Sequence, residues 1–355
     1  MNKIFSLACN WDTELIEGVK GQPISSMYAK LRQDIFGGGR VPYNIKDISF
    51  EELKNYINKM HNAGIKLIYL LNNTCNSNNE YTSKFKINLL NYVKKLKRMD
   101  VDYFCVANPY IAQVLKKNFS DIKLDVSTLA FVRTPKQAKF WESIGADQIC
   151  LAQSVNKDFN LIKAIRRSVT VPLKILVNDP CIIDCPMATV HSNYRSHSVI
   201  GGIRIEDYCN LSCKKSFFED PAEILKSSVI RPEDLEEYEK LGINYFKIVD
   251  RLMDTSWLLK VFKAYNNRKY RGNLLDLLPF YEKIKKAINQ EGNDFELFID
   301  NSKLNNFLDH IKENNCQINC GESCIYCSYL SKGITKTKNI HKAIQYYDSK
   351  LKKLI

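Results

Sequence analysis

Thiol groups at regular spacing are the strongest chemical signal in this sequence. Of its twelve cysteines, eight fall into two tight groups, and the first group consists of Cys181, Cys185, Cys209 and Cys213. Four thiolates can hold either a tetrahedral zinc ion or a 4Fe–4S cluster. Zinc ribbons favour cysteine pairs separated by two residues, whereas both pairs here are separated by three, so the spacing favours a 4Fe–4S cluster. Four buried core thiols are the alternative, which two matched pairs in a polar segment fit poorly.

The second group lies near the C-terminal end of the sequence and consists of Cys316, Cys320, Cys324 and Cys327. The last three match the three-cysteine pattern of radical-SAM enzymes, including an aromatic residue before the final cysteine, so a radical-SAM-like enzyme is one alternative. In radical-SAM enzymes a barrel follows this motif, but here only residues 328–355 follow, which are too few to build one. Cys316 also adds a fourth ligand to the three of that motif. We therefore expect a closed second 4Fe–4S cluster with an electron-relay or structural role, with zinc as the competing metal.

Short β-rich runs alternate with helical stretches from residue 4 to residue 249, and these elements must position the first cysteine group. The alternation implies parallel strands joined by crossover helices, and seven or eight such units predict a (β/α)8 TIM-like barrel, regular or irregular. An open doubly wound sheet is the alternative, although no GxGxxG motif follows the first strand. The predicted strands are Ile4–Cys9, a segment near Met27–Phe36, Lys66–Leu71, Tyr103–Val106, Lys123–Val126, Gln148–Leu151, Leu173–Val177 and Tyr245–Val249.

Two further regions are expected around this barrel. We expect residues 1–270 to form the barrel, with a Cys/His-rich insertion at residues 178–231 after the seventh strand, because that long polar stretch breaks the alternation. Residues 271–355 are expected to form a mainly helical C-terminal extension that carries the second cysteine group. The predicted helices are Phe50–Ala63, Lys84–Met99, Pro135–Ile144, Phe159–Ser168, Leu274–Asn289, Lys303–Glu313 and a final helix.

The first cysteine group is expected on the face where barrel enzymes carry their active sites. Cys181 follows the seventh strand closely, and barrel active sites lie at the C-terminal ends of the strands. Histidine can transfer protons near neutral pH, and arginine can bind a carboxylate or phosphate; support of the metal ligands is the alternative role. The predicted catalytic residues are Asn178, His191, Arg195, His197 and Asp250. The predicted substrate-binding residues are Asn72, Asn108, Ser127, Gln153, Asn193, Tyr194 and Arg251.

The charge of the chain allows a nucleic-acid partner without requiring one. The formal net charge is +13, and from residue 331 to the end there are seven lysines and one acidic residue, Asp348. A phosphate-contacting surface and a merely solvated face both fit this pattern. The sequence has no apolar run of about 20 residues and no complete signal peptide, so we expect a cytoplasmic protein that does not enter a membrane.

Several short sequence segments resemble those of the U32 peptidase family and occur in the same order along the chain, over roughly residues 45–270. They include Ile48-Ser-Phe-Glu-Glu-Leu with His61-Asn-Ala-Gly-Ile-Lys, Val126-Ser-Thr with Ala138-Lys-Phe-Trp-Glu-Ser-Ile-Gly, and the segment at Cys181. Tyr245-Phe-Lys-Ile-Val-Asp-Arg resembles the Lys-Ile-Glu-Gly-Arg strand of that family. The chain departs from the family where Asp179-Pro180 replaces Gly-Ser or Gly-Ala, where Cys185 comes early, and where Val-Asp replaces Glu-Gly.

This resemblance implies a barrel that carries a 4Fe–4S cluster held by four cysteines, two of them spaced like Cys209 and Cys213. The family includes collagenase-like proteases and oxygen-independent hydroxylases of ubiquinone precursors, transfer RNA and ribosomal RNA. In such hydroxylases prephenate supplies the oxygen atom, which would place that donor near Arg195 or Arg251.

We therefore expect an iron–sulfur-dependent, oxygen-independent redox enzyme, hydroxylase-like, acting on an RNA base or a small aromatic or peptide substrate. A collagenase-like peptidase is an alternative, although the sequence has no His-Glu-x-x-His, Gly-x-Ser-x-Gly or recognisable Cys–His protease motif. A non-catalytic iron–sulfur partner subunit is another. The expected partners are a small-molecule, peptide or RNA substrate, an electron donor, and a second subunit in a homo- or heterodimer.

Overall fold

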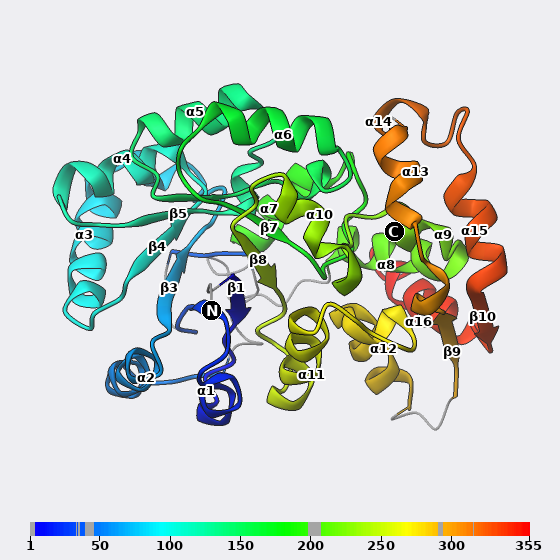
Figure 1. Ribbon diagram of the computed structural model, residues 1–355. Helices are drawn as coiled ribbons and strands as arrows, with labels where there is room; N and C mark the ends of the chain where they lie inside the picture. The colour runs from blue at the N-terminus through cyan, green and yellow to red at the C-terminus, as the bar shows by residue number, and fades with distance from the viewer. Residues whose placement is uncertain are drawn as a thin grey trace.

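The computed structural model describes residues 4–32, 34, 36–39, 46–197, 207–289, 294–314 and 316–355, and Figure 1 shows the arrangement of its elements. Eight parallel strands form a closed barrel in chain order, and the last strand pairs with the first, Phe5 lying opposite Phe246. The predicted (β/α)8 barrel is therefore confirmed. The strands are β1 (Phe5–Ala8), β2 (Ile24–Ala29), β3 (Lys66–Leu71), β4 (Tyr103–Val106), β5 (Leu124–Val126), β6 (Gln148–Cys150), β7 (Leu173–Leu176) and β8 (Tyr245–Ile248).

The barrel strands are buried on both faces, because side chains fill the interior and helices cover the outside. One interior contact is ionic. Lys174 of β7 and Asp125 of β5 form an ion pair of 2.9 Å, and each side chain is 1% exposed. Since β5 and β7 are separated by β6, this pair crosses the inside of the barrel.

The predicted helices of the barrel are confirmed to within two residues at each end. α2 begins where Ser49 and Glu52 form a reciprocal capping box, which satisfies two backbone N–H groups at its first turn. The helices around the barrel are α1 (Thr13–Val19), α2 (Phe50–Asn62), α3 (Ser83–Lys97), α4 (Pro109–Asn118), α5 (Pro135–Ser143), α6 (Phe159–Ser168), α10 (Leu235–Lys240) and α11 (Thr255–Asn266).

The second strand ends earlier than the sequence pattern predicts. β2 stops at Ala29, so most of the predicted segment Met27–Phe36 lies beyond the strand. Phe36 is buried and packs edge-to-face against Phe85 of α3 at 5.4 Å, which explains its apolar character without a strand. Gly37 follows with a φ of +70°, a conformation that only glycine adopts without steric cost.

The insertion and the extension pack together beside the barrel. The insertion contains α7 (Ala188–His197), α8 (Tyr208–Glu219) and α9 (Ala222–Lys226), and α16 (His341–Leu351) packs against α8. The extension is mainly helical, as predicted, but it also contains a two-stranded antiparallel sheet in which Thr335 lies opposite Ile299. Its other elements are α12 (Pro279–Asn289), β9 (Glu296–Ile299), α13 (Phe307–Glu313), α14 (Cys316–Asn319), α15 (Tyr326–Ile334) and β10 (Thr335–Lys338).

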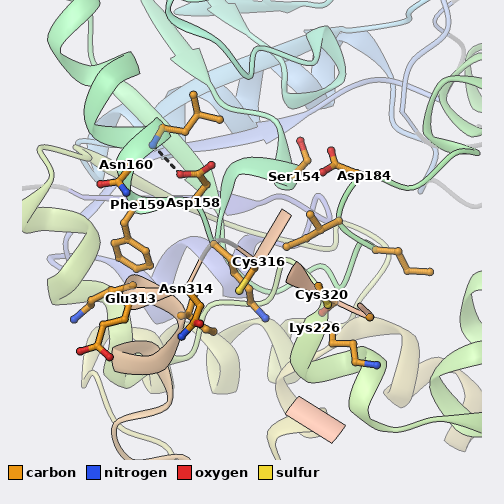
Figure 2. A pocket seen from close by; sticks show the side chains of 18 of the residues that line it. Ser154, Asp158, Phe159, Asn160, Asp184, Lys226, Glu313, Asn314, Cys316 and Cys320 are labelled. Atoms are coloured by element: carbon orange, nitrogen blue, oxygen red, sulfur yellow. Dashed lines mark hydrogen bonds between the residues drawn. The ribbon is translucent and has the colours of Figure 1, made fainter. Parts of the chain in front are cut away.

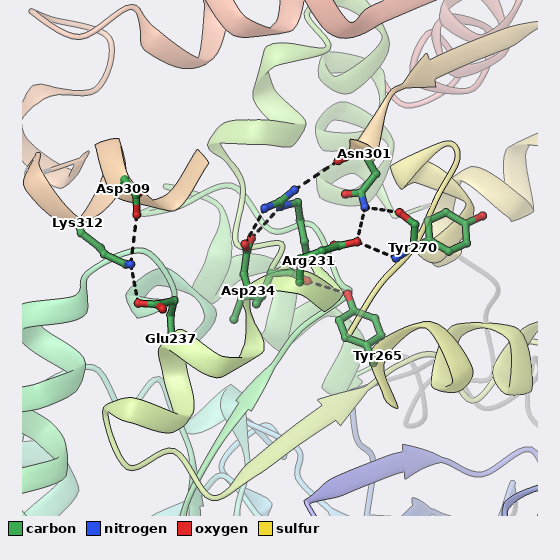
Figure 3. A network of polar contacts seen from close by, with 10 residues as sticks. Arg231, Asp234, Glu237, Tyr265, Tyr270, Asn301, Asp309 and Lys312 are labelled. Carbon is green, nitrogen blue, oxygen red and sulfur yellow. Dashed lines mark hydrogen bonds and ion pairs between the residues drawn. The ribbon is translucent and has the colours of Figure 1, made fainter. Parts of the chain in front are cut away.

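A network of polar contacts holds the extension against the end of the insertion (Figure 3). The guanidinium of Arg231 makes two bonds to the carboxylate of Asp234, at 2.7 and 2.8 Å, and donates to the backbone oxygen of Asn301. Lys312 of α13 pairs with Glu237 of α10 at 2.5 Å. The bidentate contact with Asp234 is buried and local, so it orients the guanidinium of Arg231 toward the Asn301 carbonyl of the extension.

A search of the described residues finds no helix that combines the length and the apolar character needed to span a bilayer.

Candidate cysteine site

The first cysteine group lines one pocket at the mouth of the barrel, with a volume of about 390 Å³. Cys181 and Cys185 lie in the loop that follows β7, and Cys209 and Cys213 lie on α8. Because the two cysteines on α8 are four positions apart, they occupy the same side of that helix. Folding therefore brings together thiols that are up to 32 positions apart in the sequence.

The loop that carries Cys181 is held in place by Ser228. The Cys181 N–H donates to the hydroxyl of Ser228 and the Ser228 N–H donates to the Cys181 carbonyl, both at 3.0 Å. The same hydroxyl donates to the carbonyl of Asp179 at 2.9 Å. These contacts fix the backbone of the loop, so the thiol of Cys181 has a defined position relative to α8.

Burial disfavours the charged form of three thiols of this pocket, those of Cys181, Cys209 and Cys213. Burial raises the pKa of Cys181 to about 12, and Asp179 and Cys213 add to the effect. Burial also raises the pKa of Cys213 and Cys209, and the ammonium of Lys214 opposes the increase at Cys213. A metal centre binds thiolates, so its positive charge would offset the repulsion that these groups otherwise exert on one another.

A histidine, a carboxylate and an arginine stand together on the wall of the cysteine pocket. His191 Nε2 lies 3.0 Å from Asp207 Oδ2, and Arg195 Nε lies 3.6 Å from the same oxygen. Burial lowers the pKa of His191, and the bond to Asp207 opposes this shift. His191 and Arg195 were predicted from the sequence, whereas Asp207 was not. Asp207 could have been recognised as a helix N-cap, because it comes directly before the helical segment that carries Cys209. It caps α8 by accepting from the Asn210 N–H.

The other predicted catalytic residues occupy different positions. Asp250 lines the cysteine pocket and pairs with Lys283 of α12 at 2.7 Å. Asn178 is fully buried behind the pocket, where its amide bonds to the backbone of Val249 and Leu277. His197 is exposed at the end of α7 and does not line the pocket.

The predicted substrate-binding residues divide between the pocket and its surroundings. Gln153 and Tyr194 line the cysteine pocket. Asn193 accepts from the hydroxyl of Thr74 at 2.8 Å, so it helps to join α7 to the segment after β3. Asn108 caps α4 by accepting from the Tyr110 N–H at 2.9 Å.

Two predicted residues lie deeper in the barrel mouth. Asn72 donates to the hydroxyl of Ser127 at 3.1 Å, and both residues are buried. The side-chain oxygen of Asn72 and both polar atoms of the neighbouring Asn73 have no hydrogen-bond partner in the described part of the chain. Buried polar groups are nearly always paired, so these atoms are candidates for a bound water or substrate group.

A second pocket of about 360 Å³ adjoins the cysteine pocket, and Leu252 and Lys283 line both. It contains the predicted Arg251 together with three lysines, Lys46, Lys283 and Lys286, that were not among the predicted site residues. Lys283 and Lys286 come from α12 in the extension, which no local pattern could have linked to the barrel mouth. The pocket is lined by Cys9, Asn10, Trp11, Lys46, Arg251, Leu252, Met253, Asp254, Lys283 and Lys286.

The second cysteine group is also brought together, around a small cavity of about 20 Å³ that all four cysteines line. The Cys324 N–H donates to the Asn319 carbonyl at 3.0 Å, and Cys320 and Cys324 form a backbone bridge. His310 Nε2 lies 3.5 Å from the sulfur of Cys324, and its ring stacks on Tyr326 at 3.9 Å. Cys320 is exposed, whereas the other three cysteines are partly buried.

A buried lysine stands beside this second group. Lys157 is 6% exposed, donates to the carbonyl of Leu225, and lies near the sulfurs of Cys327 and Cys316. Burial raises the pKa of Cys327 to about 11, and the ammonium of Lys157 opposes this rise. Lys157 therefore supplies a positive charge to this group from the barrel side.

A large pocket of about 740 Å³ adjoins the second cysteine group (Figure 2). Ile182 and Ile183, which stand between Cys181 and Cys185 in the sequence, line one part of it, and Cys316 and Cys320 line another. In Figure 2 the two cysteines lie close to each other, and Lys226 lies next to Cys320. The loop between Cys181 and Cys185 and two cysteines of the second group thus border one pocket, although no thiol of the first group lines it.

Among the described residues, no three His, Cys, Asp or Glu side chains are arranged to hold a single metal ion. The thiols of the first group border a pocket instead of converging on one point.

Comparison with known proteins identifies the family of this barrel. Residues 38–291 match the model of peptidase family U32. An uncharacterized protease of Methanocaldococcus jannaschii is 30% identical over 292 residues, which cover 82% of this chain and 83% of that protein. The chain belongs to the U32 peptidase family, as the sequence resemblance predicted.

The solved structure of a U32 peptidase resembles this barrel. It superposes with a TM-score of 0.52 at 23% identity, covering 70% of this chain and 92% of the other. At that identity the likeness supports the fold alone.

Proposed function

We propose that this protein is an iron–sulfur-dependent, oxygen-independent redox enzyme of the U32 peptidase family, with hydroxylase-like chemistry. The proposal is carried by one observation. Cys181, Cys185, Cys209 and Cys213, from two separate elements, line a single pocket at the mouth of the barrel, where barrel enzymes have their active sites. These four residues would hold a 4Fe–4S cluster, which would supply one-electron redox chemistry when bound.

His191 and Asp207 are suited to handle a proton at this site. Asp207 accepts a hydrogen bond from the Nε2–H of His191, so it selects the orientation of the ring and stabilises the protonated form. Because burial lowers the pKa of His191, its neutral form is favoured near neutral pH, and a neutral imidazole can accept a proton. Arg195 also contacts the Asp207 carboxylate and restricts the rotation of that carboxylate.

The adjoining basic pocket supports an anionic substrate or oxygen donor. Lys46, Arg251, Lys283 and Lys286 line it with Asp254, so the cations outnumber the acid. Asp250 and Asp254 hold Lys283 and Lys286 by ion pairs of 2.7 and 2.8 Å, which positions both ammonium groups in advance. A carboxylate or phosphate would be attracted there, and a small aromatic acid or an RNA nucleotide carries such a group.

The second cysteine group would hold a further 4Fe–4S cluster that relays electrons, with zinc as the competing metal. Its supporting observations are the exposed Cys320, the buried cation of Lys157 and the pocket that Cys316 and Cys320 share with the loop of the first group. A cation beside a buried cluster favours the reduced, more negative state.

The test is turnover under anaerobic conditions with a chemical reductant, using candidate RNA and small aromatic acids in turn, each with and without prephenate as oxygen donor. His191→Gln should lower kcat while leaving the iron content unchanged, and the exposed His197→Gln is the matched control. Hydrolysis of casein or collagen that continues after iron is removed would contradict the proposal and favour the peptidase reading.

A further inference from the structure

Three exposed apolar side chains belong to the segment that carries the second cysteine group. We call Ile318, Ile325 and Tyr329 the α15 patch. Their side chains are 71%, 73% and 76% exposed, more than any other large hydrophobic side chain of the described residues except the terminal Ile355. Single exposed apolar residues are common, but a cluster at one place marks an interaction surface.

The helix α15 presents this patch by burying its opposite side. Ile334 is buried, Cys327 and Leu330 pack against the core, and the helix lies against α9. Ile325 and Tyr329 are four positions apart, and the Tyr329 N–H donates to the Ile325 carbonyl at 2.9 Å, so both point outward. Figure 1 shows α15 at the edge of the molecule, away from the barrel.

The surface around the patch is basic. From Ile318 through Lys342 the chain has four lysines and one acidic residue, the exposed Glu322. Lys332 follows Tyr329 by one helical turn, and Lys336 lies on β10; both are exposed, and neither forms an ion pair with another described residue. Lys338 is paired with Asp294 at 2.5 Å. Apolar side chains in a segment where lysines outnumber acidic residues match a partner with an apolar centre and an acidic rim.

The patch lies directly next to the exposed end of the second cysteine group. Cys320 is exposed, it is bridged by backbone to Cys324, and Ile325 follows Cys324 in the chain. Any protein seated on the α15 patch would therefore contact the residues that enclose this group. The lysines alone would also attract RNA, but Ile318 and Ile325 contribute nothing to phosphate binding, so the apolar component favours a protein.

We propose that the α15 patch, with Lys332 and Lys336, docks a small acidic electron-carrier protein of the iron–sulfur or flavin class. This inference rests on the proposed function, because an electron carrier has reason to bind here only if the second group holds a redox centre.

The experiment uses the full chain, loaded anaerobically with iron and sulfide, and an acidic bacterial-type ferredoxin as the probe. Iron and zinc are measured first for each preparation. Binding is then measured by calorimetry at low and high ionic strength. We expect binding at low ionic strength that weakens by about tenfold or more at high salt, as for a charge-steered interface.

Two double variants separate the apolar and the charged contributions. Ile325→Ser with Tyr329→Ala should weaken binding by about tenfold or more at both salt concentrations, because it removes the apolar centre. Lys332→Glu with Lys336→Glu should weaken binding by a similar factor at low salt only. The control on another surface is Ile87→Ser with Lys84→Glu on α3, where both side chains are exposed, and it should change binding less than about twofold.

The outcomes are distinct. Iron in the C-terminal group without ferredoxin binding, or with binding that both α15 variants leave unchanged, overturns the docking proposal and leaves the proposed function standing. Zinc in that group overturns the relay part of the proposed function and removes the basis for docking. Binding of a short single-stranded RNA that the lysine variant abolishes, with no ferredoxin binding, assigns the surface to nucleic acid instead.

Discussion

Replacing Asn178 with leucine tests whether this residue positions the cysteine loop or takes part in chemistry. Its amide donates to the carbonyls of Val249 and Leu277 at 2.7 and 3.1 Å and accepts from the Val249 N–H at 2.8 Å. The side chain is fully buried, so Asn178→Leu leaves one backbone donor and two acceptors without partners. At about 1 kcal/mol for each lost bond, the free energy of unfolding should fall by about 3 kcal/mol.

The assay is urea-induced unfolding followed by circular dichroism, with the slope m compared between variants. The exposed Asn267→Leu on the outside of the barrel is the control and should change stability by less than about 0.5 kcal/mol. Because Asn178 joins the ends of β7 and β8 just before Cys181, the variant should also retain less iron. A loss below about 1 kcal/mol, accompanied by full iron content and abolished turnover, would refute the positioning role and restore the catalytic one predicted from the sequence.

Three further perturbations follow from the same contacts. Lys174→Met should lower the free energy of unfolding by about 3 kcal/mol or more, because it leaves Asp125 buried and unpaired. The double variant Lys174→Met with Asp125→Leu should recover most of that loss when its unfolding is measured. Lys157→Met should lower the midpoint potential of the second centre by about 50 mV, equivalent to about 1 kcal/mol, in an EPR-monitored redox titration; an unchanged potential would mean that its charge does not reach the centre. Asp254→Ala should cost about 1 kcal/mol at pH 7 through loss of the α11 cap. Lys286 holds the pKa of Asp254 down to about 2. The stabilisation by the charged Asp254 is therefore present above about pH 4 and is lost as the pH falls toward 2. In acid unfolding curves, the difference in stability between the variant and the parent should shrink over that window.

The barrel could be predicted from the sequence because its signals are local. Each strand is a short apolar run and each helix has an apolar stripe or a cap, as at Ser49 before α2. The second strand was misplaced because Phe36 is apolar for a tertiary reason, its contact with Phe85, which no local period records.

The cysteines of the site were also accessible from the sequence, because thiols at fixed spacing are rare. The residues that surround these cysteines were harder to predict from the sequence. Asp207 faces His191 across 16 positions, and Lys283 meets Asp250 across 33, so only the folded chain brings each pair together. Asn178 and Asn108 have the polar character expected of site residues, but folding uses that polarity to satisfy backbone groups.

The most direct test of the account is the iron, sulfide and zinc content of anaerobically purified protein, measured together with the EPR spectrum of the reduced form. With a 4Fe–4S cluster in each cysteine group, we expect about eight irons and eight sulfides per chain, with little zinc, and about four of each in the Cys209→Ala variant, whose C-terminal group stays loaded. Colourless protein with zinc in place of iron, or full iron retention after Cys209→Ala, would contradict the claim that the pocket of Cys181, Cys185, Cys209 and Cys213 holds the redox centre.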